Sequence, residues 1–162
     1  MVTASHNKRA LSATFALTLL ICSQTAALAP KRQVEFETVA KLGMSNHREK
    51  QNYVITDRAE WESLWEEMFA TVNPKPPLPE VDFTQRMLIA LFRGTTPDPC
   101  HDISVSKVVE TKGVLRVSVK EKTPGNGCVC VGSVGNAFHI IETARTEKEV
   151  EFRVKEKTVD CR

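Results

Sequence analysis

Cysteines are the residues in this chain whose chemistry depends most on their surroundings. The chain has five, and all except Cys22 lie in its C-terminal part: Cys100, Cys128, Cys130 and Cys161. In an oxidising compartment an even number of cysteines pairs into disulfides, so these four predict two bonds. The alternative is a metal site that combines Cys128 and Cys130 with His101 or His139. Zinc motifs, however, usually separate their thiolates by two or more residues.

The pairing of the cysteines follows from an expected hairpin about Lys112-Gly113. If Val109 lies opposite Val114, counting outward along both strands brings Cys100 opposite Thr123. Cys128 closes the turn that Thr123 opens, so Cys100 and Cys128 are expected to meet. We therefore predict the bonds Cys100–Cys128 and Cys130–Cys161. A slip of one residue in the register would reverse this assignment.

Groups arranged for catalysis are sparse. The sequence has no Gly-x-Ser-x-Gly elbow, no His-x-x-x-His pair and no phosphate-binding glycine loop. Asp82, Asp98 and Asp102 fall at expected turns and strand edges, where aspartate commonly forms turns and caps. We therefore expect a protein that is not an enzyme and that carries no cofactor or metal.

The segment around His101 is the sharpest isolated feature. A histidine beside a turn-borne cysteine could bind a metal or sense pH, but a partly exposed loop residue is far commoner. We name this segment as the candidate partner-binding loop, with the residues Thr96, Pro97, Asp98, Pro99 and His101. His139, between Phe138 and Ile140, is expected to face solvent or to pack lightly.

The N-terminal segment has the order of a secretory signal peptide. Lys8 and Arg9 come first, an apolar stretch runs from Leu11 to Cys22, and small residues follow up to Ala29. The apolar stretch is shorter than the about 20 residues that cross a bilayer. We expect residues 1–29 to be removed, with an uncleaved membrane anchor as the alternative.

Two details concern how this segment is processed. Pro30 disfavours a cut directly after Ala29, and a cut after Ala27 avoids it. Lipid attachment at Cys22 is not expected, because bulky Ile21 stands where a lipobox has a small residue.

The charge and length of the remaining chain limit the classes of partner and the number of domains that we expect. The sequence has 22 Lys and Arg residues against 20 Asp and Glu, and residues 1–29 hold two of the basic residues and none of the acidic ones. The remainder is neutral and has a single tyrosine, which gives no electrostatic footprint for nucleic acid or an anionic membrane. Residues 30–162 suit one domain with one hydrophobic core.

Asp57 opens the one clear helix. Its side chain can accept from the free N–H groups of the first turn, and Glu60 completes a capping box. Apolar residues then share one stripe at helical spacing: Trp61, Leu64, Trp65, Met68 and Phe69. We expect this stripe to pack on a sheet, with a ligand groove between the tryptophans as the alternative. The prolines of residues 73–80 predict an extended connector, or a docking segment for a partner's aromatic groove.

The rest of the chain has the patterns of β-strands. The apolar run Met87 to Phe92 predicts a central strand under the helix, covered on both faces. Other strands are expected at 34–42, 53–56, 103–110, 115–120, 128–134, 137–143 and 150–159. These elements predict a mostly β, α+β fold: a mostly antiparallel sheet, folded as a sandwich or open barrel, with one packed amphipathic helix.

One ordered series of motifs spans most of the chain. It consists of Val54-Ile55, a capped helix bearing Trp61 and Trp65, a proline-rich link, Val81-Asp82-Phe83, an apolar strand ending at Gly94, a Pro124-Gly125 turn and Phe138-His139-Ile140-Ile141. Over residues 34–154 this order resembles the C-terminal domain of the PrcB-type protease-complex subunit family.

The resemblance implies an exported, non-catalytic protein that acts through protein–protein contacts. Many members of that family carry a Thr-Gly-Gly-Tyr-like turn after the apolar strand. Here residues 95–101 have the sequence Thr-Thr-Pro-Asp-Pro-Cys-His, so no role for this loop is carried over.

Two functions are therefore expected from the sequence. The first is an interaction module of the secreted, periplasmic or envelope space, an accessory or stabilising subunit for another exported protein such as a protease. The alternative is a secreted protease inhibitor that presents loops on a β-scaffold. In either case the mature chain is expected to bind no nucleic acid and to have no membrane span.

Overall fold

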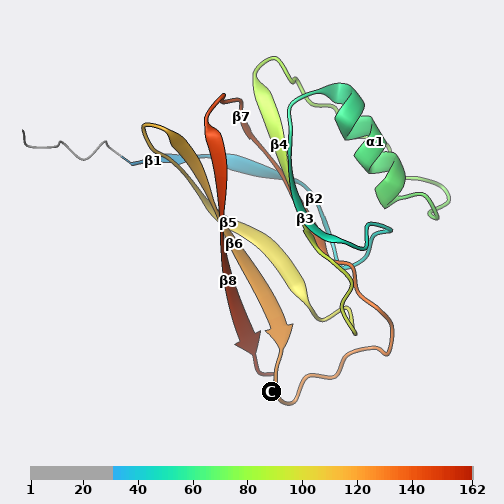
Figure 1. Ribbon diagram of the computed structural model, residues 1–162. Coiled ribbons are helices and arrows are strands. Elements are labelled where there is room, and N and C mark those ends of the chain that lie inside the picture. The colour runs from blue at the N-terminus through green and yellow to red at the C-terminus, as the bar shows by residue number, and fades with distance from the viewer. Residues whose placement is uncertain (1–30, 162) are drawn as a thin grey trace, which may run out of the picture.

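A computed structural model describes residues 31–161 (Figure 1). The expected signal peptide and Cys22 lie outside the described residues. The elements in chain order are β1 (Arg32–Val34), β2 (Phe36–Leu42), β3 (Lys50–Ile55), α1 (Arg58–Met68), β4 (Arg86–Arg93), β5 (Asp102–Glu110), β6 (Val114–Pro124), β7 (Phe138–Ala144) and β8 (Glu149–Val159).

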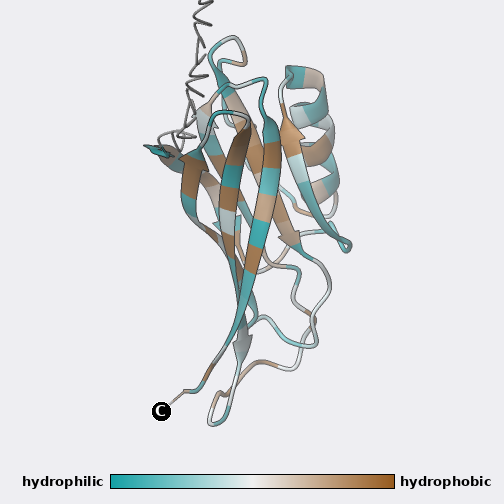
Figure 2. Cartoon of the chain, turned by 60° about the vertical axis from the view of Figure 1, so that its left-hand side comes forward, coloured by the Kyte–Doolittle hydropathy of each residue, from teal (hydrophilic) through white to brown (hydrophobic). Residues whose placement is uncertain are grey.

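The strands form two four-stranded sheets. Sheet A has the order β1-β5-β6-β8 and sheet B the order β2-β7-β4-β3, with α1 packed on sheet B (Figure 1). Hydrophilic and hydrophobic bands alternate along the long strands, as expected when one face of a sheet is buried (Figure 2). The predicted mostly β fold with one packed helix is confirmed as a sandwich, and neither sheet closes into a barrel within residues 31–161.

Strand β4 separates the two hydrophobic cores. One set of its side chains, including Met87 and Ile89, packs between the sheets, and the alternating set, including Leu88 and Phe92, packs toward α1. Every residue between the two terminal arginines of this strand is buried. The predicted central strand, covered on both faces, is thus confirmed, while a single domain over residues 30–162 stays a prediction.

The aromatic stripe of α1 is part of the core. Trp61 and Trp65 are buried, and their indole nitrogens donate to the carbonyls of Pro79 and Pro76, both at 3.0 Å. The proline-rich connector therefore lies along the helix and covers both tryptophans, which leaves no ligand groove between them. Within residues 31–161 no helix has the length and apolar character needed to cross a membrane.

The last strand departs most from the expected antiparallel pattern. β8 pairs with β6 in parallel, from Val114 opposite Glu149 to Pro124 opposite Val159. The polar turn after β7 carries the chain from sheet B across to sheet A, so that β8 starts beside the start of β6. As a result the C-terminal residues lie beside the far end of β6 (Figure 1).

His139 is buried between the sheets, so the expectation that it faces solvent is wrong. Its Nδ1 accepts the backbone N–H of Val105 at 2.9 Å, and its Nε2 lies 2.9 Å from the Thr38 hydroxyl. This arrangement requires the neutral ring that carries its proton on Nε2. The pKa of His139 is lowered from 6.5 to about 4, chiefly by burial and also by nearby Lys41, while Asp102 opposes the shift.

The buried ring makes stability depend on pH. Because the folded pKa is depressed, the unfolded chain binds the proton first as the pH falls, and stability is lost from about pH 6.5 toward pH 4. We expect the free energy of unfolding to fall by about 2 kcal/mol between pH 7 and pH 5 from this residue alone. Urea titrations at both pH values measure it. The same loss in a His139→Gln variant would show that another group is responsible.

Candidate partner-binding loops

The candidate loop 96–101 leaves sheet B at the end of β4. Gly94 turns the chain at a φ of 77°, where an added Cβ would lie 2.9 Å from the Lys50 nitrogen. Thr96 and Gly135 then form a two-way bridge, with N–H to carbonyl distances of 2.8 and 3.0 Å. This bridge ties the loop to the long segment between β6 and β7.

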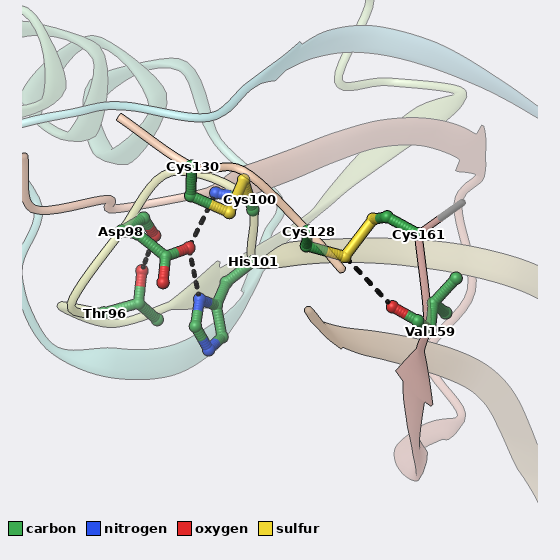
Figure 3. Close-up of a disulfide and its surroundings, with 8 residues drawn as sticks. All are labelled: Thr96, Asp98, Cys100, His101, Cys128, Cys130, Val159 and Cys161. Carbon is green, nitrogen blue, oxygen red and sulfur yellow. Dashed lines mark hydrogen bonds and ion pairs between the residues drawn. A yellow bond between two sulfur atoms is a disulfide. The ribbon is translucent and has the colours of Figure 1, made fainter. Parts of the chain in front are cut away.

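Asp98 organises the rest of this loop. Its Oδ1 accepts the backbone N–H of Cys100 at 3.0 Å and lies 3.1 Å from Nδ1 of His101 (Figure 3). The Thr96 hydroxyl donates to the Asp98 carbonyl at 2.8 Å. Among the named candidate residues, Thr96 is buried, Asp98, Pro99 and His101 are half-buried, and only Pro97 is exposed. Thr96, Asp98 and His101 therefore hold the loop in shape.

The four cysteines form two disulfides, as predicted, but the predicted pairing is wrong. The bonds are Cys100–Cys130 and Cys128–Cys161, with Cα atoms 5.9 and 4.7 Å apart (Figure 3). Cys161 follows β8, whose parallel pairing brings it to the end of β6, and its N–H donates to the Asn126 carbonyl at 2.9 Å. Cys161 therefore reaches Cys128, and Cys130 pairs with Cys100.

The hairpin register also differs from the expected one. Val109 lies opposite Arg116 instead of Val114, and a bulge between Val105 and Lys107 shifts the register again. Asp102 consequently lies opposite Lys122. The assumed turn is two residues out of register at the start of the hairpin, and the bulge moves every pair beyond it by one residue, so counting outward from the turn reaches the wrong partners.

The thiol and imidazole groups considered as metal ligands are dispersed. Cys128 and Cys130 belong to different disulfides, and both ring nitrogens of His139 are within hydrogen-bond distance of protein groups. Among residues 31–161 one group of candidate ligands has its ligand atoms within 4.8 Å of one another, formed by Asp98, Cys100 and Cys130. The two sulfurs of this group are joined to each other, and thiolates are what metals bind.

The segment between β6 and β7 forms the exposed part of this end of the molecule. A strand was predicted at 128–134, and this prediction is wrong: β6 runs on to Pro124 and no strand follows before β7. Val129, Val131 and Val134 expose 98%, 67% and 55% of their surface. Three exposed valines within six residues are unusual, because exposed apolar side chains are normally scattered singly. We call residues 128–134 the valine loop.

Both ends of the valine loop are anchored. On one side Gly127 has a φ of 75°, where an added Cβ would lie 2.5 Å from the Cys161 carbonyl oxygen. On the other side the Asn136 N–H donates to the Gly43 carbonyl at 3.1 Å. Val129 stands between two cysteines, each bonded to a different part of the chain. The loop thus combines a restricted backbone with exposed apolar side chains.

The disulfides are expected to contribute directly to stability. Replacing the Cys128–Cys161 pair by serines should lower the free energy of unfolding by about 2–4 kcal/mol, because the unfolded chain regains freedom over the closed loop. The Cys100–Cys130 pair closes a loop of similar length, 30 against 33 residues, and should give a similar loss. Denaturant unfolding of each double-serine variant measures both. A loss below about 1 kcal/mol in both variants would contradict this prediction.

A second apolar surface lies at the helix side of the molecule. A hollow of about 580 Å³ opens between the end of β2, the end of α1 and the proline-rich connector, and the partly exposed Leu42, Met44 and Val72 line it. It belongs to elements other than the valine loop, so substitutions in it can serve as controls for substitutions in the valine loop.

Comparison of the chain with protein-family profiles, curated proteins and solved structures found no match.

Proposed function

We propose that this protein is an exported, non-catalytic interaction module that docks on a partner protein through the valine loop. It acts as an accessory or stabilising subunit of that partner. The observation that carries the proposal is Val129, which is 98% exposed between two disulfide-bonded cysteines. Aliphatic side chains exposed in this way gain free energy when a partner covers them.

The disulfides support docking because they reduce its entropic cost. A free loop must be ordered on binding, which costs about 0.5–1.5 kcal/mol for each immobilised rotamer-rich side chain. Two cross-links within three residues restrict the backbone before the partner arrives. Valine adds little to this cost, because its branched side chain has few rotamers.

Export is supported by the same cross-links. Disulfides persist in oxidising compartments and are rare in reducing ones. The signal-peptide-like order of residues 1–29 agrees with this location. The resemblance to PrcB-type subunits favours a protease as the partner.

The proposal is tested by quantitative capture of the partner. The tagged chain is expressed in its native host, cross-linked in intact cells and purified, and bound proteins are quantified by mass spectrometry. A Val129→Asp/Val131→Asp variant should reduce the specific partner by about tenfold or more, which corresponds to about 1.4 kcal/mol. The matched control is Val72→Asp, an exposed valine in the other apolar hollow, which should leave capture unchanged. Loss of capture with the control alone would move the interface to that hollow.

A protease inhibitor is the second candidate function. The favouring observation is again Val129, since an exposed residue on a cross-linked loop can enter a protease cleft. Proteases with a small S1 pocket accept residues of this size. The purified protein should then inhibit an elastase-type protease, and Val129→Asp should abolish inhibition. Rapid cleavage of the loop without inhibition would reject this function.

A further inference from the structure

Four lysines gather on the outer face of sheet A beside the valine loop. The sequence Lys-Glu-Lys occurs at residues 120–122 on β6 and again at 155–157 on β8. The parallel register places Lys120 opposite Lys155 and Lys122 opposite Lys157. We call these residues the lysine quartet: Lys120, Lys122, Lys155 and Lys157.

Strand alternation separates the charges of these two segments. Side chains two residues apart share a face, so the quartet points to one face and the glutamates to the other. Glu121 is buried and accepts from Lys50 and Arg93 of sheet B, and Glu156 lies 3.9 Å from Lys50. No carboxylate of the described residues forms an ion pair with any lysine of the quartet.

The quartet works against the stability of the free protein. Like charges directly opposite each other on neighbouring strands are destabilising. Lysines on an edge strand can serve to prevent sheet aggregation, which would account for Lys155 and Lys157 on β8. It does not account for Lys120 and Lys122, because β6 lies inside the sheet.

The geometry of this face fits an extended chain. The quartet lines a shallow hollow of about 300 Å³. Within the described residues β8 pairs with β6 alone and is an edge of sheet A, so its outer side is open to another strand. Lysines two residues apart repeat at about 6.6 Å, the spacing of alternate side chains along any strand.

We propose that the lysine quartet binds an acidic segment of the partner protein, extended along the open edge of β8 with carboxylates at alternate positions. This assignment rests on the proposed function, because the quartet adjoins the docking end: Lys122 lines a small hollow together with Cys128 and Cys161. The segment adds main-chain hydrogen bonds to β8 and places its carboxylates beside Lys155 and Lys157. The flexible stems of Lys120 and Lys122 reach the same charges from the next strand.

The test uses the purified protein with both disulfides intact and two labelled octapeptides of the same composition. One alternates Glu and Thr, and the other has four Glu followed by four Thr. By fluorescence anisotropy at low salt, the alternating peptide should bind about fivefold more tightly or better, because its carboxylates share one face. Equal binding of both peptides would overturn the proposal, and so would tighter binding of inorganic tripolyphosphate, which would indicate a phosphate site.

Variants separate the quartet from general charge effects. Lys120→Gln/Lys155→Gln should weaken binding of the alternating peptide by about tenfold. The matched control Lys107→Gln/Lys112→Gln removes two exposed lysines outside the quartet, one on β5 and one in the turn between β5 and β6. It should change binding of the alternating peptide by less than about twofold. The quartet variant should melt at the same temperature as the parent or higher, since it loses a repulsion. Equal weakening in both variants would overturn the proposal. The peptide-binding assay contains no partner protein. A negative result in it therefore rejects the acidic-segment site, while a negative result in the capture experiment rejects docking through the valine loop.

Discussion

Replacing Trp65 by alanine is expected to lower the free energy of unfolding by about 3–5 kcal/mol, the usual cost of truncating a large core aromatic. Trp65 is 5% exposed and lies between two aromatic neighbours, with ring centroids 5.0 Å from Trp61 and 4.6 Å from Phe69. Its loss leaves a cavity between the helix and the connector, and the Pro76 carbonyl loses its donor.

Trp65→Phe serves as the control for this prediction. Phenylalanine keeps most of the packing but has no N–H for Pro76, so the loss should be only about 1–2 kcal/mol. Chemical denaturation with intrinsic fluorescence and circular dichroism measures both variants. If the alanine variant loses less than about 1 kcal/mol, the aromatic stripe is not a core element and the helix docks in another way.

The second large effect is expected at Glu121, which joins the two sheets. Its carboxylate is 1% exposed, accepts from Lys50 Nζ at 2.9 Å and pairs with the Arg93 guanidinium, which is itself largely buried. Lys50 and Arg93 lie opposite each other on β3 and β4, so both strands are tied to β6 at one point. Glu121→Leu removes the only carboxylate that Arg93 contacts among the described residues, and should cost about 3–5 kcal/mol.

The matched control removes both buried charges. Arg93→Met/Glu121→Leu replaces the ion pair by apolar side chains of similar volume, which is often neutral in other proteins. We therefore expect the double variant to unfold within about 1 kcal/mol of the parent. If the double variant is as unstable as Glu121→Leu alone, the loss comes from packing and not from an unpaired arginine.

Local periodicity was sufficient to predict the elements that depend on neighbouring residues. The helix N-cap at Asp57 is an example, since the Glu60 N–H donates to the Asp57 carboxylate at 2.9 Å. The unbroken apolar run in β4 likewise implied two covered faces, and the structure has both. These features are set within about ten residues of sequence, where side-chain spacing and burial agree.

The same patterns do not predict which strands pair when they lie far apart in the sequence. A strand such as β8 has one alternation whether it joins β6 in parallel or β7 in an antiparallel hairpin, so its partner could not be chosen. The disulfide error followed from this, because Cys161 lies where β8 ends. The burial of His139 was missed for a related reason, since its partners Thr38 and Val105 come from strands distant in sequence.

The sequence predicts one part of the candidate site, loop 96–101, but not the valine loop. Loop 96–101 stood out by composition, and the structure places it against the valine loop through Cys100–Cys130. The valines themselves fit a strand in the sequence, because alternating Val and Cys resembles strand periodicity. A signal was present: residues 125–136 include four of the chain's seven glycines, which disfavours a regular strand. Glu121 continues the inward alternation of Val117 and Val119, and so could have been identified as a buried charge.

Non-reducing peptide mapping of the protein recovered from its native host shows whether an exported chain holds the valine loop between two disulfides. We expect a chain that lacks residues 1–29, or nearly so, and that yields the linked peptides Cys100–Cys130 and Cys128–Cys161. Four free thiols on a chain that still carries its N-terminal segment would contradict both the export and the restrained docking loop.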